Sequence, residues 1–154
     1  MLLIDDRLRT LGIELPKPST PGANYVPYVR SGDLVFLTGQ LPQWNGERKY
    51  IGKVGREYTV DDGKKAARMC ALNLISHLRV AVEGDLDRVV RCVRITGFVN
   101  SAPDFYHHPQ VINGASDLLV EVFGDAGRHA RLSVGVAALP YDQAVEVDAM
   151  FEVR

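Results

Sequence analysis

The sequence predicts a single α+β domain in which helices cover one face of a β-sheet. Its 154 residues are close to the commonest size of one domain, and 46% of them are hydrophobic. β-rich segments and two helical patterns follow one another in the order β-β-α-β-α-β-β. We expect this domain to span residues 23–154. Residues 1–22 are expected to form an N-terminal appendage, with a mild helical pattern over residues 6–12 and three prolines between residues 16 and 21.

The first half of the chain contains a predicted hairpin and a predicted helix. Two β-rich segments, residues 25–29 and 34–38, are separated by a polar turn that contains a glycine. Thr59 followed by Asp62 resembles a capping box, which marks the start of a helix. Apolar residues then recur at helical spacing, so we expect the helix to end near residues 83–84.

The second half predicts a long strand, a second helix and two further strands. Residues 88–100 are rich in valine, isoleucine, threonine and phenylalanine, which favour a strand. Pro109 can open a helix that stops at Gly124, although the Asn-Gly pair at residues 113–114 does not favour helix. The remaining β-rich segments span residues 130–137 and 144–153, and their separation by a short loop predicts a hairpin.

The predicted terminal hairpin has two different faces. Alternation assigns Leu132, Val134 and Val136 to the helix-covered face, together with Val145, Val147, Ala149 and Phe151. Arg131, Ser133, Glu146 and Asp148 then share the other face, with Gly135 opposite Glu146 and Ser133 opposite Asp148. This polar face either meets water and holds an ordinary ion pair, or meets another subunit and forms a polar pocket.

Composition and charge exclude several classes of protein. With 18 Lys and Arg against 19 Asp and Glu, the net charge is −1, so no global basic field attracts nucleic acid. The sequence shows no secretory signal and no membrane-spanning stretch, and we expect a cytoplasmic protein that binds no membrane. Cys70 and Cys92 are expected to be buried free thiols rather than a disulfide. The adjacent His107 and His108 lack metal-ligand spacing, so no metal site is predicted.

Three sequence blocks carry a resemblance to a known family. Residues 127–140, GRHARLSVGVAALP, are followed by VEVDA at residues 145–149. Tyr25 precedes VFLTGQLP at residues 35–42, and FVN at residues 98–100 precedes an Asp-Phe pair and Asn113. In this order the blocks resemble the signature of the RidA/YjgF/L-PSP family of reactive-intermediate deaminases, and specifically a longer YjgF-like subgroup.

The resemblance implies both a fold and an activity. Members fold like the Bacillus type of chorismate mutase, with a mixed sheet and two helices on one face. They assemble as homotrimers whose sheets form a central barrel, with small-molecule clefts between subunits. Deaminating members hydrolyse 2-aminoacrylate and related 2-imino or enamino acids to 2-keto acids and ammonia without a cofactor. The implied partners are therefore a small carboxylate-bearing metabolite and two further copies of the chain.

The resemblance also implies roles for individual residues. Arg131 matches the family's substrate arginine, whose planar guanidinium suits a bidentate hold on a carboxylate. Glu146 matches the acidic residue that could orient or deprotonate water. Four further residues match or adjoin substrate-binding positions: Tyr25, Thr38, Asn113 and Ser133.

Several features depart from the deaminase pattern and leave other functions open. Ala23-Asn24 replaces the usual Gly-Pro, Ser133 stands where cysteine is usual, and the loop at residues 106–109 is longer than in compact members. One alternative is a non-catalytic trimer that binds small anions or has a regulatory role. Another is an endoribonuclease or translation inhibitor of the L-PSP type, against which the near-neutral charge argues.

Overall fold

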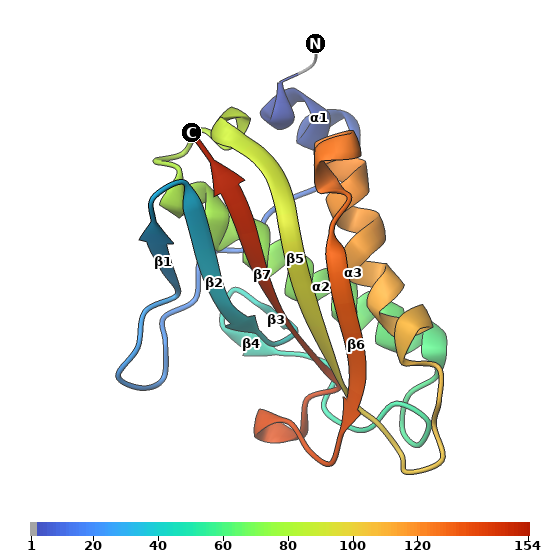
Figure 1. Cartoon of the computed structure of the whole chain (residues 1–154). Helices are drawn as coiled ribbons and strands as arrows, with labels where there is room; N and C mark the ends of the chain where they lie inside the picture. The colour runs from blue at the N-terminus through green and yellow to red at the C-terminus, as the bar shows by residue number, and fades with distance from the viewer. Residues whose placement is uncertain (1–2) are drawn as a thin grey trace.

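A computed structural model describes residues 3–154, and it contains a five-stranded mixed sheet with two long helices behind one face (Figure 1). The strands lie in the order β1-β2-β7-β5-β6, and only β5 and β6 run parallel. The five strands are β1 (Tyr28–Ser31), β2 (Leu34–Gln40), β5 (Val89–Asn100), β6 (Ala130–Val136) and β7 (Val145–Val153). The long helices are α2 (Val60–Ala81) and α3 (His108–Phe123). The predicted α+β class and element order are confirmed.

Smaller elements connect this framework. Helix α1 (Ile4–Thr10) lies beside the C-terminal end of α3 in Figure 1. A two-stranded ribbon follows β2, and three short 3₁₀ turns join later elements. They are β3 (Gln43–Trp44), β4 (Glu47–Arg48), η1 (Leu86–Arg88), η2 (Gly124–Gly127) and η3 (Pro140–Asp142).

The capping box predicted for the first long helix is present. The Thr59 hydroxyl accepts the backbone N–H of Asp62 at 3.2 Å, and the Asp62 carboxylate accepts the backbone N–H of Thr59 at 3.0 Å. Two backbone N–H groups at the start of the helix thereby gain acceptors, which fixes where α2 begins. Its buried stripe, which includes Cys70, Leu74 and Leu78, then packs on the sheet.

Gly114, which appeared unsuited to a helix, permits close contact between the two long helices. A Cβ atom at this position would overlap the backbone carbonyl of Lys64 in α2. Packing between α2 and α3 therefore outweighs the low helix propensity of glycine at this point. The helix also begins one residue earlier than predicted, at His108.

The predicted hairpin between the last two strands is wrong. Strand β5 lies between β6 and β7: Val99 pairs with Gly135 on one side and with Val145 on the other. Because β5, α3 and β6 form a β-α-β unit, β6 runs parallel to β5 and the following chain crosses the end of β5 to reach β7. Short spacing between two strands did not make them neighbours.

This topology also reverses the predicted faces of β6. Arg131, Ser133 and Gly135 pair with Ile95, Gly97 and Val99, which face the helices. Neighbouring residues in a ladder share a face, so these three β6 residues point to the helix-covered side. Leu132, Val134 and Val136 instead belong to the open side, and Leu132 is 47% exposed. The predicted faces of β7 are correct, because Val145, Val147, Ala149 and Phe151 are buried.

The open face of the sheet carries apolar side chains. Phe36 on β2 is 41% exposed, and Leu132 on β6 is similarly exposed. Phe98, Val134 and Met150 are half-buried on the same side. No helix within residues 3–154 lies over this face in Figure 1, so an apolar surface remains uncovered in the single chain.

Both cysteines are free and buried, as predicted. Burial raises the pKa of the Cys70 thiol well above its usual value and raises that of Cys92 to about 12. Both side chains are therefore protonated packing groups at neutral pH.

The N-terminal segment is attached along its length. Leu8 of α1 is buried in the core, and the Ser76 hydroxyl on α2 donates to the carbonyl of Pro16 at 2.6 Å. The backbone N–H of Lys17 donates to the Asn45 side chain at 2.8 Å. Met1 and Leu2 of the predicted appendage lie outside the described residues. Among the helices of residues 3–154, none has the length and apolar character to cross a membrane.

Candidate functional site

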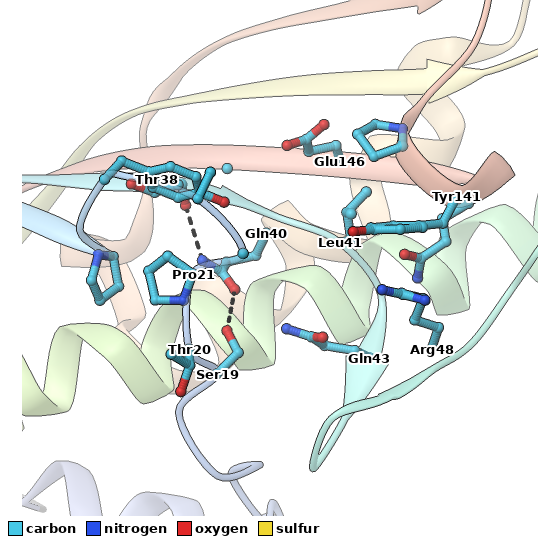
Figure 2. Close-up of a pocket in the computed structure, with 17 residues that line it drawn as sticks. Ser19, Thr20, Pro21, Thr38, Gln40, Leu41, Gln43, Arg48, Tyr141 and Glu146 are labelled. Atoms are coloured by element: carbon cyan, nitrogen blue, oxygen red, sulfur yellow. Dashed lines mark hydrogen bonds between the residues drawn. The ribbon is translucent and has the colours of Figure 1, made fainter.

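One pocket brings together three of the six predicted site residues. Tyr25, Thr38 and Glu146 line a cavity of about 330 Å³ between the N-terminal segment, the end of β2 and the start of β7 (Figure 2). Its other walls include Ser19–Gly22, Gln40, Arg48 and Tyr141. The predicted appendage thus supplies one wall of the cavity.

A distortion at the end of β2 shapes this pocket. The pairing of β2 with β7 is irregular between Leu37 and Gln40, which is typical of a β-bulge. The Thr38 hydroxyl donates to the carbonyl of Val26 at 2.7 Å and so anchors the segment that follows Tyr25. Gln40 is buried, and its side chain accepts a hydrogen bond from Ser19 and donates one to the Thr38 carbonyl, both at 3.3 Å (Figure 2).

The Glu146 carboxyl group lies where Gly39 has no side chain. A Cβ atom at Gly39 would stand only 2.6 Å from Glu146 Oε1. Burial, and then the nearby charge of Asp148, raise the pKa of the half-buried Glu146. A carboxylate of raised pKa holds a proton more readily, so it suits a group that takes a proton from water and returns it later.

Arg48 is the one cation among the described residues that line this pocket. Its guanidinium carbon lies 3.4 Å from the centre of the Tyr141 ring, which is a cation–π contact. Tyr141 has a φ of 59°, and this left-handed conformation places it at the turn before β7.

The other three predicted residues lie together at a second place, between β6 and α3. The Arg131 guanidinium donates to the Ser116 hydroxyl at 3.0 Å and to the Pro109 carbonyl at 3.1 Å. Asn113 lies on the same face of α3 as Pro109 and Ser116, because it follows Pro109 by four residues and precedes Ser116 by three. The Ser133 hydroxyl is buried without a hydrogen-bond partner among the described residues.

Within one chain, therefore, Arg131 and Glu146 do not share a pocket. Arg131 points to the helix-covered side of the sheet, whereas Glu146 pairs with Phe98 on the open side. The predicted ion-pair geometry depended on the β6–β7 hairpin, which the fold does not contain.

Sequence reasoning missed several lining residues. Gln40 lies within the TGQLP motif and Tyr141 directly follows the Leu-Pro pair at residues 139–140, so these motifs could have indicated both residues. No motif in the sequence marks Arg48, because the sequence of the β3–β4 ribbon that contains it is typical of a polar loop. Throughout residues 3–154, no three His, Cys, Asp or Glu side chains group together as a metal site.

Comparisons with known proteins identify close relatives. "Protein TCP17" of Trypanosoma cruzi is 50% identical over 148 residues, which cover 96% of this chain and 92% of that protein. The Agrobacterium tumefaciens protein Atu1372, described as having unknown function, has a TM-score of 0.91 at 43% identity, with 99% and 94% of the two chains covered. A "putative endoribonuclease" from Shewanella oneidensis has a TM-score of 0.95 at 36% identity, with 99% and 100% covered.

A more distant solved structure contains a ligand. TdcF from E. coli, solved with bound serine, has a TM-score of 0.59 at 25% identity and covers 91% of this chain and 93% of its own. Residues 5–152 match the family described as "YjgF/chorismate mutase-like, putative endoribonuclease". The chain therefore belongs to the YjgF/chorismate mutase-like family, and its α+β sheet and helices have the fold of that family.

Proposed function

We propose that the protein hydrolyses small 2-imino or enamino acids to 2-keto acids and ammonia in clefts between copies of a homotrimer. The observation that carries this proposal is the division of the predicted site. Tyr25, Thr38 and Glu146 line one pocket, whereas Arg131 and its neighbours lie on another surface of the chain. The Glu146 pocket lacks Arg131 and the Arg131 surface lacks Glu146, so a site that contains both residues needs a second copy.

The open face of the sheet supports the trimer. Exposed apolar side chains such as Phe36 and Leu132 are costly in water and gain stability when a partner covers them. Cyclic assembly is a common way for identical chains to cover such a face. In this arrangement the β6 and α3 surface of one copy lies beside the Glu146 pocket of the next.

Each residue then has a chemical role. Arg131 would hold the substrate carboxylate with two parallel hydrogen bonds, and Tyr25 and Thr38 would orient the rest of the molecule. An enamino acid would first take up a proton on its β-carbon, which gives the same protonated imine as a 2-imino acid. Glu146 would then take a proton from water as the water oxygen bonds to the carbon of the protonated imine and the C=N π electrons move to nitrogen. That proton then passes to nitrogen, the C–N bond breaks, and loss of the hydroxyl proton leaves a 2-keto acid and ammonia.

The ligand of a related structure supports the substrate class. TdcF is described with bound serine, a small molecule that carries a carboxylate and an amino group. A small carboxylate-bearing metabolite therefore fits the present site, and Arg131 is the residue proposed to bind its carboxylate.

The test is complementation between two inactive variants. Arg131→Ala and Glu146→Gln should each lose most 2-aminoacrylate hydrolysis, measured as pyruvate release above the uncatalysed rate. When equal amounts are unfolded and refolded together, random assembly should restore about one quarter of the wild-type clefts. The same variants mixed without refolding serve as the control.

Three results would refute the proposal. Full activity of Arg131→Ala would remove its role, and failure of refolded trimers to regain activity would contradict a shared cleft. Absence of turnover in the wild type would instead favour a non-catalytic anion-binding trimer, the alternative left open by the sequence.

A further inference from the structure

A second cavity of about 530 Å³ lies where β5 and β6 end, away from the Glu146 pocket. Three polar side chains converge on it from separate segments: Lys53, Ser101 and His108. Phe105, Tyr106 and Val136 form an apolar wall. A mostly apolar cavity of this size with a few converging polar groups is the usual form of a small-molecule site.

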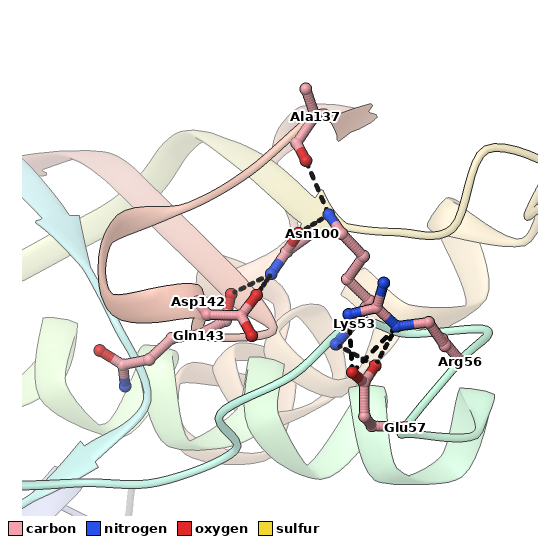
Figure 3. A network of polar contacts seen from close by, with 7 residues as sticks. All are labelled: Lys53, Arg56, Glu57, Asn100, Ala137, Asp142 and Gln143. Carbon is pink, nitrogen blue, oxygen red and sulfur yellow. Dashed lines mark hydrogen bonds and ion pairs between the residues drawn. The ribbon is translucent and has the colours of Figure 1, made fainter.

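Lys53 is held at the edge of this cavity by two uncharged acceptors. Its ammonium donates to Asn100 Oδ1 at 2.5 Å and to the carbonyl of Ala137 at 2.6 Å (Figure 3). An ammonium group has three N–H donors, so one remains for a ligand. Because Asn100 is fully buried, the position of the charge is fixed before any ligand binds.

The positive charge of Lys53 is not neutralised by a carboxylate. Across the described residues, no ion pair includes Lys53. The two nearby acids do not pair with the Lys53 ammonium (Figure 3). Glu57 pairs with Arg56 and accepts the backbone N–H of Lys53 at 2.9 Å, and Asp142 accepts the Asn100 amide at 3.0 Å. The charge is therefore available to an anion.

Ser101 and His108 add neutral hydrogen-bonding groups. His108 Nε2 lies 3.0 Å from Ser101 Oγ, and its ring packs edge-on against Phe105 at 5.3 Å. A Cβ atom at Gly135 would clash with both His108 and Ser101, so glycine makes room for this pair. Burial, and then the nearby charge of His107, lower the pKa of His108, which favours its neutral form at neutral pH. When Nε2 carries the proton and donates to Ser101, the serine O–H is free for a ligand oxygen.

We infer that this cavity binds a small monocarboxylate with a short apolar chain. The single ammonium matches a single negative charge, with Ser101 as second donor to the carboxylate. The chain would lie along Phe105, Tyr106 and Val136, where burial of methylene groups stabilises the complex. Neither Arg131 nor Glu146 lines this cavity, and the inference does not depend on the proposed deamination.

Hexanoate is a suitable probe, with binding followed by isothermal titration calorimetry. Lys53→Met should weaken hexanoate binding about 10-fold or more, because a charged hydrogen bond is lost. Lys65→Met removes the same charge from the exposed side of α2 and should change binding less than about twofold. Hexan-1-ol, which keeps the chain but not the charge, should bind the wild type about 10-fold more weakly.

Two more variants separate this site from its alternatives. Ala137 is exposed at the cavity, so Ala137→Phe should fill the space and weaken hexanoate binding about 10-fold while Lys53 stays in place. It keeps the inference testable if Lys53→Met does not fold. Arg131→Ala should leave hexanoate binding unchanged, because Arg131 does not line this cavity. No binding to the wild type, equal binding by Lys53→Met or Ala137→Phe, or loss of binding only in Arg131→Ala would overturn the inference.

Discussion

The contact between Gly39 and Glu146 leads to a quantitative prediction about activity. In Gly39→Ala, the new Cβ would lie 2.6 Å from Glu146 Oε1, whereas ordinary contacts begin at 3.4 Å, so the carboxylate must move by about 0.8 Å. A displacement near 1 Å at a reacting group can lower the rate about 100-fold. We expect kcat/KM for 2-aminoacrylate hydrolysis to fall about 10- to 100-fold. The neighbour that must move is the end of a flexible side chain, so the variant should fold.

Gly22→Ala provides the matched control. Gly22 lines the same pocket, but a Cβ atom there has nothing within 4 Å. Steady-state pyruvate release and thermal unfolding would be measured for both variants. Gly22→Ala should keep activity within about twofold, and both should keep a single cooperative transition. Wild-type kcat/KM in Gly39→Ala would refute the idea that the position of Glu146 over Gly39 matters for the reaction.

Three further predictions concern stability. Burial raises the pKa of the Glu146 carboxyl group above 4.5, so the stability of the wild type falls as the pH rises through that raised value. Glu146→Gln should therefore raise the free energy of unfolding at pH 7 and change it little below about pH 4.5. Urea unfolding across pH tests this, and an equal effect at all pH values would contradict it. Gly114→Ala should lower the free energy of unfolding by about 1–3 kcal/mol, because its Cβ overlaps the Lys64 carbonyl, and an unchanged urea midpoint would refute that packing. Asn100→Ala should lower the free energy of unfolding by about 2–4 kcal/mol, because the buried Asn100 amide makes three hydrogen bonds, including one from Lys53. A decrease below about 1 kcal/mol would contradict the importance of these hydrogen bonds.

The elements of the fold could be predicted from local signals, but their pairing could not. The Thr59–Asp62 capping box and the β-rich segments are encoded by neighbouring residues, and both appear in the structure. The position of β5 between β6 and β7 depends on contacts between distant segments. Apolar alternation also does not predict the faces of β6, because Leu132, Val134 and Val136 lie on the open side of the sheet while Arg131 points to the helices.

The candidate site was predictable to a similar extent. Tyr25, Thr38 and Glu146 could be identified by motif, and they line one pocket. Arg48 enters that pocket only through the tertiary placement of its ribbon, and no local pattern marks it. The separation of Arg131 from Glu146 also follows from sheet topology, which spacing in the sequence does not determine.

The strap formed by residues 16–22 has a practical consequence for comparing family members. Ser19–Gly22 border the Glu146 pocket, and the Pro16 carbonyl accepts a hydrogen bond from Ser76 on α2. Removal of the strap would therefore open the pocket and break this hydrogen bond to α2. Differences in substrate range between long and short members could then originate in this strap while the reacting groups stay the same. Exchange of the strap alone between two such proteins would reveal how much selectivity resides outside the shared motifs.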